Sequence, residues 1–247
     1  FKPADLIVIA AKKSVGKTVL LNQIAFFNAR RGNKGVLINL EMRKEDIINR
    51  EIARIGEIDY ADISMGKMNK EQLERYQKAS EEISQYPVII STKRGLTVAQ
   101  IHSKLLMLKN KLGRLDFVII DYIQKIRTPK GHSRQRELAN LSEEFGAMAQ
   151  HFNCPFFIGS QVNHEGITRE AEDLENDADV VLKLRREVFE YKSKFIKTTH
   201  FPKLNGKEMP EDYATLQITK NRNGRTGGIE LQSVLAFQRF EDWIKAL

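Results

Sequence analysis

The sequence predicts an α/β protein built on a mostly parallel, twisted sheet with helices on both faces. Short apolar runs alternate with segments of helical periodicity as far as Leu184, as expected when crossover helices join parallel strands. The last part of the chain has two short runs on either side of Asn223 and Gly224, which is typical of an antiparallel hairpin. Hydrophobic residues make up 41% of the chain, which is enough to form a core.

Each expected parallel strand is a short, continuous apolar run, the pattern of strands that are covered on both faces. The six runs are residues 6–10, 36–40, 88–90, 117–121, 155–159 and 180–184. The hairpin is expected to pair residues 215–218 with residues 228–231. We therefore expect six parallel strands that end in an antiparallel pair.

The segments between these strands have helical spacing. In the first of them Leu20, Leu21, Ile24 and Ala25 recur at helical intervals, and glycines follow its end. The expected helices are residues 17–31, 47–55, 71–84, 98–111 and 134–151. Residues 192–212 are polar, with two prolines and no clear period. We predict a loop or insertion there, within a single domain that spans residues 1–247.

Composition excludes several classes of protein. The 40 Lys and Arg residues outnumber the 32 Asp and Glu, and the net charge of +8 suggests an anionic partner without identifying it. Cys154 is the only cysteine, which excludes an internal disulfide framework and a zinc site of several thiolates. No apolar run approaches the roughly 20 residues that span a bilayer, so no membrane partner is predicted. The chain starts at Phe1 without a signal peptide, and we expect it to be a piece of a longer protein.

Residues 11–18, which read Ala-Lys-Lys-Ser-Val-Gly-Lys-Thr, predict a phosphate-binding loop. The segment follows an expected strand and opens an expected helix, the context that such a loop requires. Gly16 lets the backbone approach the phosphates, and the N–H groups from Ser14 and Val15 onward point at the anion. Lys17 would reach the β and γ phosphates, and Thr18 would hold Mg²⁺. The alternative is a chance Gly-Lys-Thr at a helix start, which the flanking elements disfavour.

Three further polar residues follow expected strands. Asp121 ends a strand at the edge where the phosphate loop also lies, so its carboxylate could support the metal. Glu41 follows another strand and could polarise the attacking water, although a glutamate before a helix also suits the helix dipole. Gln161 follows the fifth strand and could sense the γ-phosphate. A solvated loop glutamine is the alternative for Gln161.

In chain order these segments resemble the DnaB-type replicative helicases, specifically their RecA-like C-terminal motor domain. The family often has alanine where Ala11 opens the phosphate loop. The other matching segments are Leu40-Glu41-Met42, Arg50, Gly66-Lys67-Met68, residues 119–124, residues 160–163, Asp177-Ala178-Asp179 and residues 220–224. The resemblance covers nearly the whole chain and implies a RecA-like P-loop NTPase.

The resemblance also implies roles for these residues. ATP, or another NTP, would be hydrolysed with Mg²⁺ at a site that includes Arg50. Arg222, assisted by Lys220, would complete the site of the neighbouring subunit in a head-to-tail homo-hexamer. A solvated basic hairpin is the alternative for these two residues. The implied partners are single-stranded DNA, a helicase loader and a primase, in the cytoplasm of a bacterial or phage-infected cell.

Two loops are candidates for DNA contact, residues 125–136 and 163–169, and the first of them is basic. Basic loops track phosphates without reading sequence. One follows Asp121 closely and carries Lys125, Arg127, Lys130, Arg134 and Arg136. The other runs from Asn163 to Arg169, and Arg169-Glu170 matches a DNA-contacting pair of the family. Solvated charged loops are the alternative.

The chain also departs from the family pattern. Lys12-Lys13 replaces Arg-Pro, Asn176 stands where glutamine is common, and Glu172 replaces an expected glycine. Residues 192–212 look longer than in the family, and the family's N-terminal domain and linker are missing from this sequence. Two other functions therefore stay open. One is a recombinase-like or regulatory RecA-type ATPase without unwinding, and the other is a nucleotide-bound assembly module.

Overall fold

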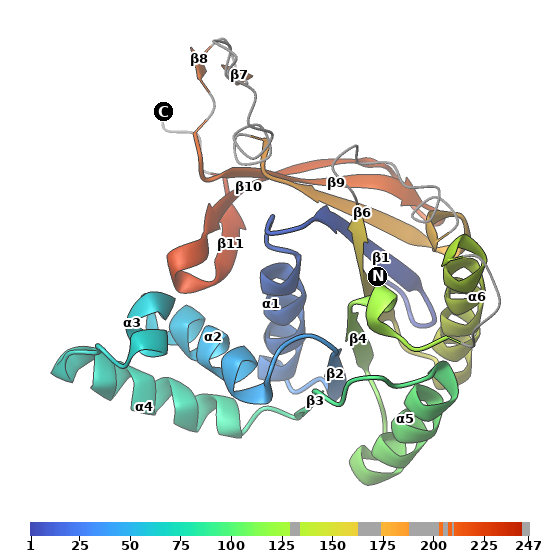
Figure 1. Ribbon diagram of the computed structural model, residues 1–247, viewed down its shortest axis with the longest axis horizontal. Coiled ribbons are helices and arrows are strands. Elements are labelled where there is room, and N and C mark those ends of the chain that lie inside the picture. The colour runs from blue at the N-terminus through green and yellow to red at the C-terminus, as the bar shows by residue number, and fades with distance from the viewer. Residues whose placement is uncertain (129–133, 163–173, 188–202, 205–206, 209, 244–247) are drawn as a thin grey trace.

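The computed structural model describes residues 1–128, 134–162, 174–187, 203–204, 207–208 and 210–243 (Figure 1). Its helices are α1 (Lys17–Arg30), α2 (Lys44–Gly56), α3 (Tyr60–Met65), α4 (Lys70–Ser84), α5 (Val98–Leu112) and α6 (Arg134–Phe152), with 3₁₀ turns η1 (Ile123–Lys125) and η2 (Leu235–Phe237). Its strands are β1 (Leu6–Lys12), β2 (Gly35–Asn39), β3 (Val88–Ser91), β4 (Phe117–Asp121), β5 (Phe156–Val162), β6 (Val180–Arg185), β7 (Lys203–Leu204), β8 (Lys207–Glu208), β9 (Tyr213–Asn221), β10 (Gly227–Val234) and β11 (Arg239–Asp242). Within the described residues, no helix is both long and apolar enough to cross a membrane.

Nine of these strands form one sheet in the order β11-β10-β9-β6-β1-β5-β4-β2-β3. The neighbours from β6 to β3 are all parallel. Strand β9 joins the other side of β6 in the antiparallel sense, and β10 and β11 continue from it in the same way. The predicted fold class, a mostly parallel sheet flanked by helices with an antiparallel C-terminal part, is confirmed.

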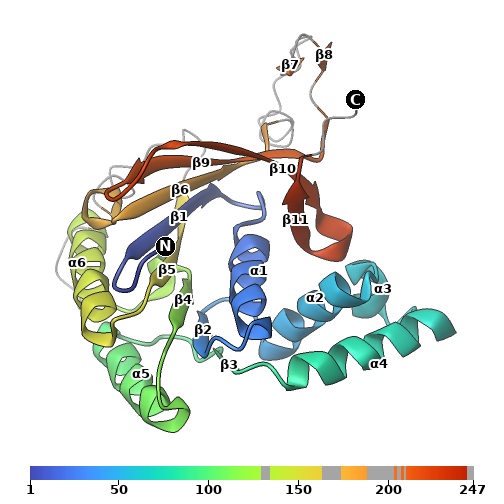
Figure 2. The same cartoon turned by 180° about the vertical axis from the view of Figure 1, so that it is seen from behind.

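The core lies on both faces of the sheet, because the side chains of a strand alternate between its faces. On β1, Leu6 and Val8 face one cluster, which also contains buried residues of α5 and α6. Ile7 and Ile9 face the opposite cluster, with buried residues of α1 and α2. Figures 1 and 2 show the two groups of helices on opposite sides of the sheet.

The antiparallel extension curves over the side of the sheet that α1 covers, and β11 lies beside this helix (Figure 1). Gln23 of α1 fixes the contact by pairing with the backbone of Phe240 in both directions, at 2.8 Å each. The sequence did not predict β11 or the six-residue helix α3, which is capped by the Asp59 side chain. Both elements are too short to give a periodic signal.

The C-terminal hairpin is confirmed, with Thr215 opposite Glu230 in its register. Its connection is longer than a two-residue turn at Asn223 and Gly224, since the strands end at Asn221 and resume at Gly227. Within the predicted loop 192–212, the described residues include the two-stranded pair β7–β8. The rest of that segment lies mostly outside the described residues, and the single-domain assignment stays a prediction.

Candidate nucleotide-binding site

The carboxyl edge of the parallel strands gathers most of the predicted site. Residues from the phosphate loop, the end of β5 and the segment after β2 line one pocket with a volume of about 410 Å³. Its lining residues are Lys12, Lys13, Ser14, Gly16, Lys17, Thr18, Val19, Glu41, Met42, Arg50, Gln161, Leu235 and Gln238. Parallel α/β sheets place their ligands at this edge.

The phosphate loop has the backbone that a bound anion needs. Ser14 has a φ of 66° and Gly16 has a φ of 114°, so the chain turns through the left-handed region twice just before α1 begins. A Cβ atom at Gly16 would lie 2.7 Å from Cζ of Phe240, which also requires glycine at this position. No side chain caps the N-terminus of α1, and its first turn has no acidic residue. The helix start therefore offers its N–H groups to an anion.

Lys17 and Asp121 form a buried ion pair at the centre of this edge. Thr18 donates its hydroxyl to Oδ2 of the same carboxylate at 2.7 Å, and Nδ2 of Asn39 donates to that oxygen at 3.2 Å. Gly159 on β5 leaves space for the pair, because a Cβ there would lie 3.0 Å from Nζ of Lys17 and 3.1 Å from Oδ1 of Asp121. The sequence predicted that Lys17, Thr18 and Asp121 would meet, and the structure brings them into direct contact.

These groups fit a magnesium nucleotide. Carboxylate and hydroxyl oxygens are ligands that Mg²⁺ prefers in proteins, and Asp121 and Thr18 present them side by side. Asp121 is fully buried, and a buried carboxylate needs a cation next to it. The Lys17 ammonium and the N–H groups of the loop are suited to phosphate oxygens.

Glu41 and Arg50 line the same pocket from the segment after β2. The Glu41 side chain is exposed, while its N–H and that of Met42 donate to Oδ1 of Asn39 at 3.0 and 2.7 Å. Nη1 of Arg50 donates to Oε1 of Gln238, and its guanidinium lies 4.8 Å from the ring centroid of Tyr60. The asparagine that ends β2 thus orients the turn that carries Glu41.

Sequence reasoning missed Leu235 in η2 and Gln238 directly after it, which also line the pocket. Gln238 has a φ of 52°, and Nε2 of its side chain donates to the Leu235 carbonyl at 2.6 Å. No local pattern marks these residues, because they reach the pocket only through the curvature of the antiparallel strands.

Gln161 lies near the end of β5, and its backbone is held from the neighbouring segment. Nε2 of Gln124 donates to its carbonyl at 3.2 Å, and the Gln161 N–H donates to Oε1 of Gln124 at 3.2 Å. The predicted sensor segment therefore lies beside the phosphate loop, and Gln124 is a contact that the sequence did not predict.

Lys220 and Arg222 lie at the opposite edge of the sheet from the phosphate loop. The end of β9 pairs with the start of β6, and Nη1 of Arg222 donates to Oδ1 of Asp179 at 2.8 Å. Lys220 donates to the carbonyls of Glu175 and Asn176 at 3.0 and 2.7 Å. The seven residues of β1 separate this edge from the phosphate loop by about 20 Å, so neither side chain joins the pocket of its own chain.

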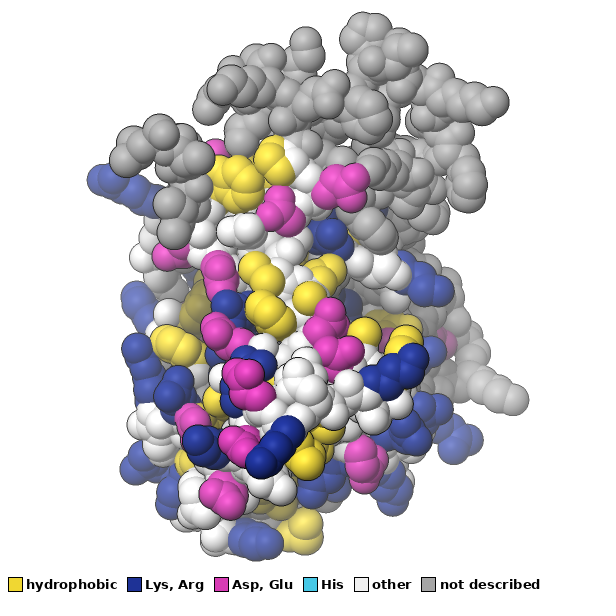
Figure 3. Space-filling view, turned by 90° about the vertical axis from the view of Figure 1, so that its left-hand side faces the viewer, with side chains coloured by type: hydrophobic (Ala, Val, Ile, Leu, Met, Phe, Trp, Pro, Cys, Tyr) yellow, Lys and Arg dark blue, Asp and Glu magenta, His cyan; other side chains and the backbone are white. Residues whose placement is uncertain are grey.

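The predicted DNA-contacting residues are described only in part. Lys125 and Arg127 are exposed at the end of η1 and just after it. Arg134 and Arg136 lie in the first turn of α6, but their side chains are outside the described part, as are Lys130, Arg169 and Glu170. On the face shown in Figure 3, acidic and basic side chains alternate without a continuous basic patch among the described residues. The net positive charge is therefore not concentrated on that face.

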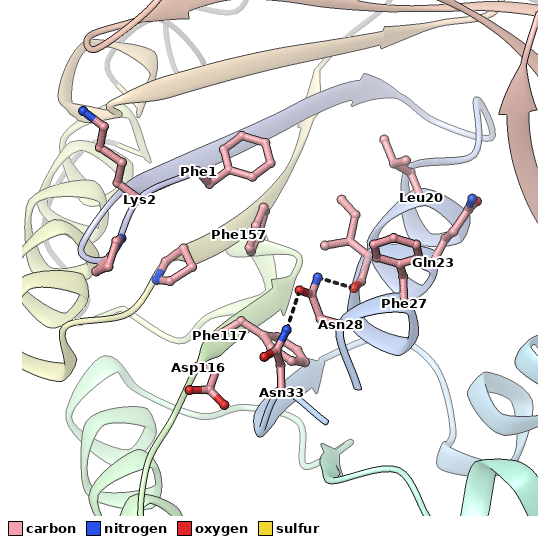
Figure 4. A pocket seen from close by; sticks show the side chains of 13 residues that line it. Phe1, Lys2, Leu20, Gln23, Phe27, Asn28, Asn33, Asp116, Phe117 and Phe157 are labelled. Atoms are coloured by element: carbon pink, nitrogen blue, oxygen red, sulfur yellow. Dashed lines mark hydrogen bonds between the residues drawn. The ribbon is translucent and has the colours of Figure 1, made fainter. Parts of the chain in front are cut away.

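A larger cavity of about 660 Å³ lies elsewhere along α1 and does not suit a phosphate (Figure 4). Its walls include Phe1, Phe27, Phe117 and Phe157, and its asparagine side chains bond to each other and to the backbone. Among the described residues, no cluster of three or more His, Cys, Asp or Glu side chains could hold a metal ion. Cys154 is buried in the core, and this burial raises the pKa of its thiol to about 12.

Comparisons with known proteins place this geometry in a family. The family model described as DnaB-like helicase C terminal domain matches residues 1–242. The replicative DNA helicase DnaB of Haemophilus influenzae is 27% identical over 98% of this chain and 52% of its own length, and that of Geobacillus stearothermophilus is 28% identical over 97% and 53%. The chain spans about half the length of the curated relatives it matches.

Solved structures agree with this assignment. One solved ATPase domain superposes with a TM-score of 0.84 at 25% identity, covering 99% of this chain and 86% of its own. A DnaB-like replicative helicase, solved in a study of its interactions with primase, gives a TM-score of 0.83 at 26% identity, covering 97% and 59%. With a family model that matches nearly its whole length, the chain belongs to the DnaB-like helicase C-terminal domain family.

Proposed function

We propose that this chain is the motor domain of a ring-shaped replicative helicase, which hydrolyses ATP or another NTP and moves along single-stranded DNA. The observation that carries this proposal is the contact of Lys17, Thr18 and Asp121 at the carboxyl edge, in a pocket that Glu41 and Gln161 also line. A nucleotide-binding module without turnover would need no second carboxylate such as that of Glu41 in this pocket.

The residues divide the chemistry among them. Lys17 and the N–H groups of residues 14–18 would hold the β and γ phosphates, while Thr18 and Asp121 would hold Mg²⁺. The metal, when bound, would neutralise charge that develops on the phosphates. Glu41 would accept a proton from the attacking water. Gln161 would lie at the γ-phosphate, and Arg50 and Gln238 would line the part of the pocket farther from it.

The site would be completed by a second copy of the chain. Arg222 and Lys220 lie at the edge away from their own phosphate loop, so any contact that they make with a nucleotide would be with that of another subunit. A positive side chain from a neighbour stabilises the charge on the transferring phosphoryl group. Contacts that run head to tail in this way can close into a ring, and we propose a homo-hexamer.

The DNA would contact the basic segment after Asp121, including Lys125 and Arg127, and the loop after β5. We propose a cytoplasmic location and further contacts with a helicase loader and a primase. The primase contact is supported by the solved relative whose study concerns its interactions with primase.

The test is ATP hydrolysis over a range of protein concentrations, with and without single-stranded DNA. Specific activity that rises with concentration and is stimulated by DNA supports a shared site in a motor. Native mass spectrometry at the same concentrations reports whether the chain assembles. Assembled rings that bind nucleotide without turnover would instead favour an assembly module, and turnover without strand displacement would favour a recombinase-like or regulatory ATPase.

A further inference from the structure

Gln124 makes a set of hydrogen bonds that the proposed chemistry does not use. It lies in η1, three residues after Asp121. Its carboxamide reaches across to β5, where Nε2 donates to Oγ of Ser160 at 3.1 Å and to the Gln161 carbonyl at 3.2 Å. Oε1 accepts the Gln161 N–H at 3.2 Å. One side chain thus holds both backbone polar groups of Gln161.

The Gln124 side chain bonds to the backbone of β5 where β4 no longer pairs with it. The register between β4 and β5 ends at Ile120 and Ile158, but β5 continues to Val162. Beyond Ile158, the backbone of β5 still needs partners on the side that faces β4. The Gln124 amide supplies a donor and an acceptor with the spacing of a peptide group. The position of Gln161 therefore depends on a side chain from the segment after β4.

The contact also lies where both candidate DNA segments begin. Gln124 directly precedes Lys125, the first residue of one basic segment, and the second segment follows β5 directly. Lys125 also lies near the ring of Tyr122, with Nζ 5.7 Å from the ring centroid, and Nζ of Lys17 lies 4.4 Å from the same centroid. A displacement of the segment after β4 would therefore be transmitted to the strand end that carries Gln161.

We propose that Gln124 is a positioning residue that couples DNA bound at Lys125 and Arg127 to the Gln161 side chain in the nucleotide pocket. The amide fixes the strand end, and the Gln161 side chain that extends from it lines the pocket. DNA that shifts the segment beginning at Lys125 would move the amide and, with it, Gln161. This proposal rests on the proposed function, because it assumes that DNA stimulates hydrolysis.

The test compares stimulation by single-stranded DNA in the wild type, in Gln124→Met and in Gln150→Met. Methionine has nearly the length of glutamine but lacks the amide. Gln150 is exposed on α6 and serves as the control. Gln124→Met removes all three hydrogen bonds, so we expect the fold-stimulation to fall by at least about fivefold, the effect of one net hydrogen bond. Gln150→Met should match the wild type. Stimulation of Gln124→Met equal to that of the wild type would overturn the proposal.

Two further measurements separate coupling from simple loss of structure. A fluorescent ATP analogue should bind Gln124→Met with nearly the wild-type Kd, since Gln124 does not line the pocket. In a Gln161→Met background, Gln124→Met should have no further effect on stimulation, because the two residues act in series. Independent, multiplicative effects would contradict the proposal.

A second variant covers the case in which Gln124→Met unfolds. Gln124→Glu keeps an acceptor for the Gln161 N–H and loses the amide donor, so we expect stimulation between those of the wild type and Gln124→Met. Full stimulation would count against the proposal. If the wild type itself assembles and hydrolyses ATP but is not stimulated by DNA, the proposed function and this inference both fail. A stimulated wild type with an equally stimulated Gln124→Met removes only this inference.

Discussion

The two edges of the parallel sheet differ in how they hold their charged side chains. At the carboxyl edge, Asp121 is fully buried and contacts Lys17, Thr18 and Asn39. At the amino edge, the Arg222 side chain is 61% exposed, although it pairs with Asp179. The charged groups of the carboxyl edge therefore bind one another within the chain, whereas the amino edge exposes the Arg222 guanidinium to solvent.

This difference would allow one chain to take part in two sites, as the proposed ring requires. A buried ion pair fixes the reacting groups before the nucleotide arrives, which favours transition-state stabilisation. An exposed arginine on a hairpin can exchange its own carboxylate for a neighbour's phosphate. We infer that the length of the strands keeps the nucleotide pocket apart from the arginine that would serve a neighbour. Four predictions test this contrast between the two edges.

Removing the exposed cation should give the largest effect. Arg222→Ala should lower hydrolysis by about 10³-fold, the smaller end of what an arginine finger supplies, while Arg225→Ala in the same connection should change it little. Arg222→Ala and Lys17→Ala, each inactive alone, should regain activity when mixed, because one interface then has both an intact pocket and an intact arginine. Hydrolysis by the mixture is the measurement, and a mixture as inactive as its parts would place Arg222 outside the neighbour's site.

At the carboxyl edge, Glu41→Gln should lower turnover by at least about 10²-fold, because the proton acceptor is lost. Nucleotide affinity should stay near the wild-type value, since the phosphate loop is unchanged. Glu45→Gln, an exposed glutamate in the first turn of α2, is the matched control. Steady-state hydrolysis and equilibrium binding of a fluorescent nucleotide measure the two quantities, and unchanged turnover would exclude the role assigned to Glu41.

The buried carboxylate should also matter for folding. Asp121→Asn leaves the Lys17 ammonium buried without its counter-charge, and removing one partner of a buried ion pair destabilises a protein by about 3 kcal/mol. Urea unfolding without nucleotide measures this loss. A change below about 1 kcal/mol would show that the pair is no stronger than a surface salt bridge.

The sequence predicted Lys17, Asp121 and Gln161 at the carboxyl edge because each of them ends or follows a recognisable strand. Apolar runs locate β1, β4 and β5, and parallel strands must end at one edge, so Lys17, Asp121 and Gln161 are brought near each other by topology alone. The Asn39 contact could have been found from the same rule, since Asn39 ends β2 next to β4.

The rest of the pocket could not be predicted in this way. Gln238 and Leu235 reach it through strands that pair antiparallel and curve back, and no spacing in the sequence shows which residue will face the phosphate loop. Gln124 was included in a matching segment, but its bonds to Gln161 depend on where the β4–β5 ladder ends. Arg222 was assigned to a neighbour through the resemblance, and its distance from its own loop is what the structure adds.

The smallest effect is expected at the amino edge, for Asp179→Asn. The asparagine oxygen can still accept the Leu6 N–H, which now bonds Oδ2 of Asp179 at 2.9 Å. Its NH2 group then faces Arg222, so the charge and the hydrogen bond opposite Arg222 are both lost. Because Arg222 is largely exposed, the free energy of unfolding should fall by less than about 1 kcal/mol. Hydrolysis should persist, because Arg222 itself is retained and is freer to reach a neighbouring nucleotide. Urea unfolding and hydrolysis at several protein concentrations test both statements. A loss of activity as large as that of Arg222→Ala would mean that Asp179 must hold the arginine during catalysis. The contrast between a carboxyl edge with fixed groups and an amino edge with a free arginine would then be wrong.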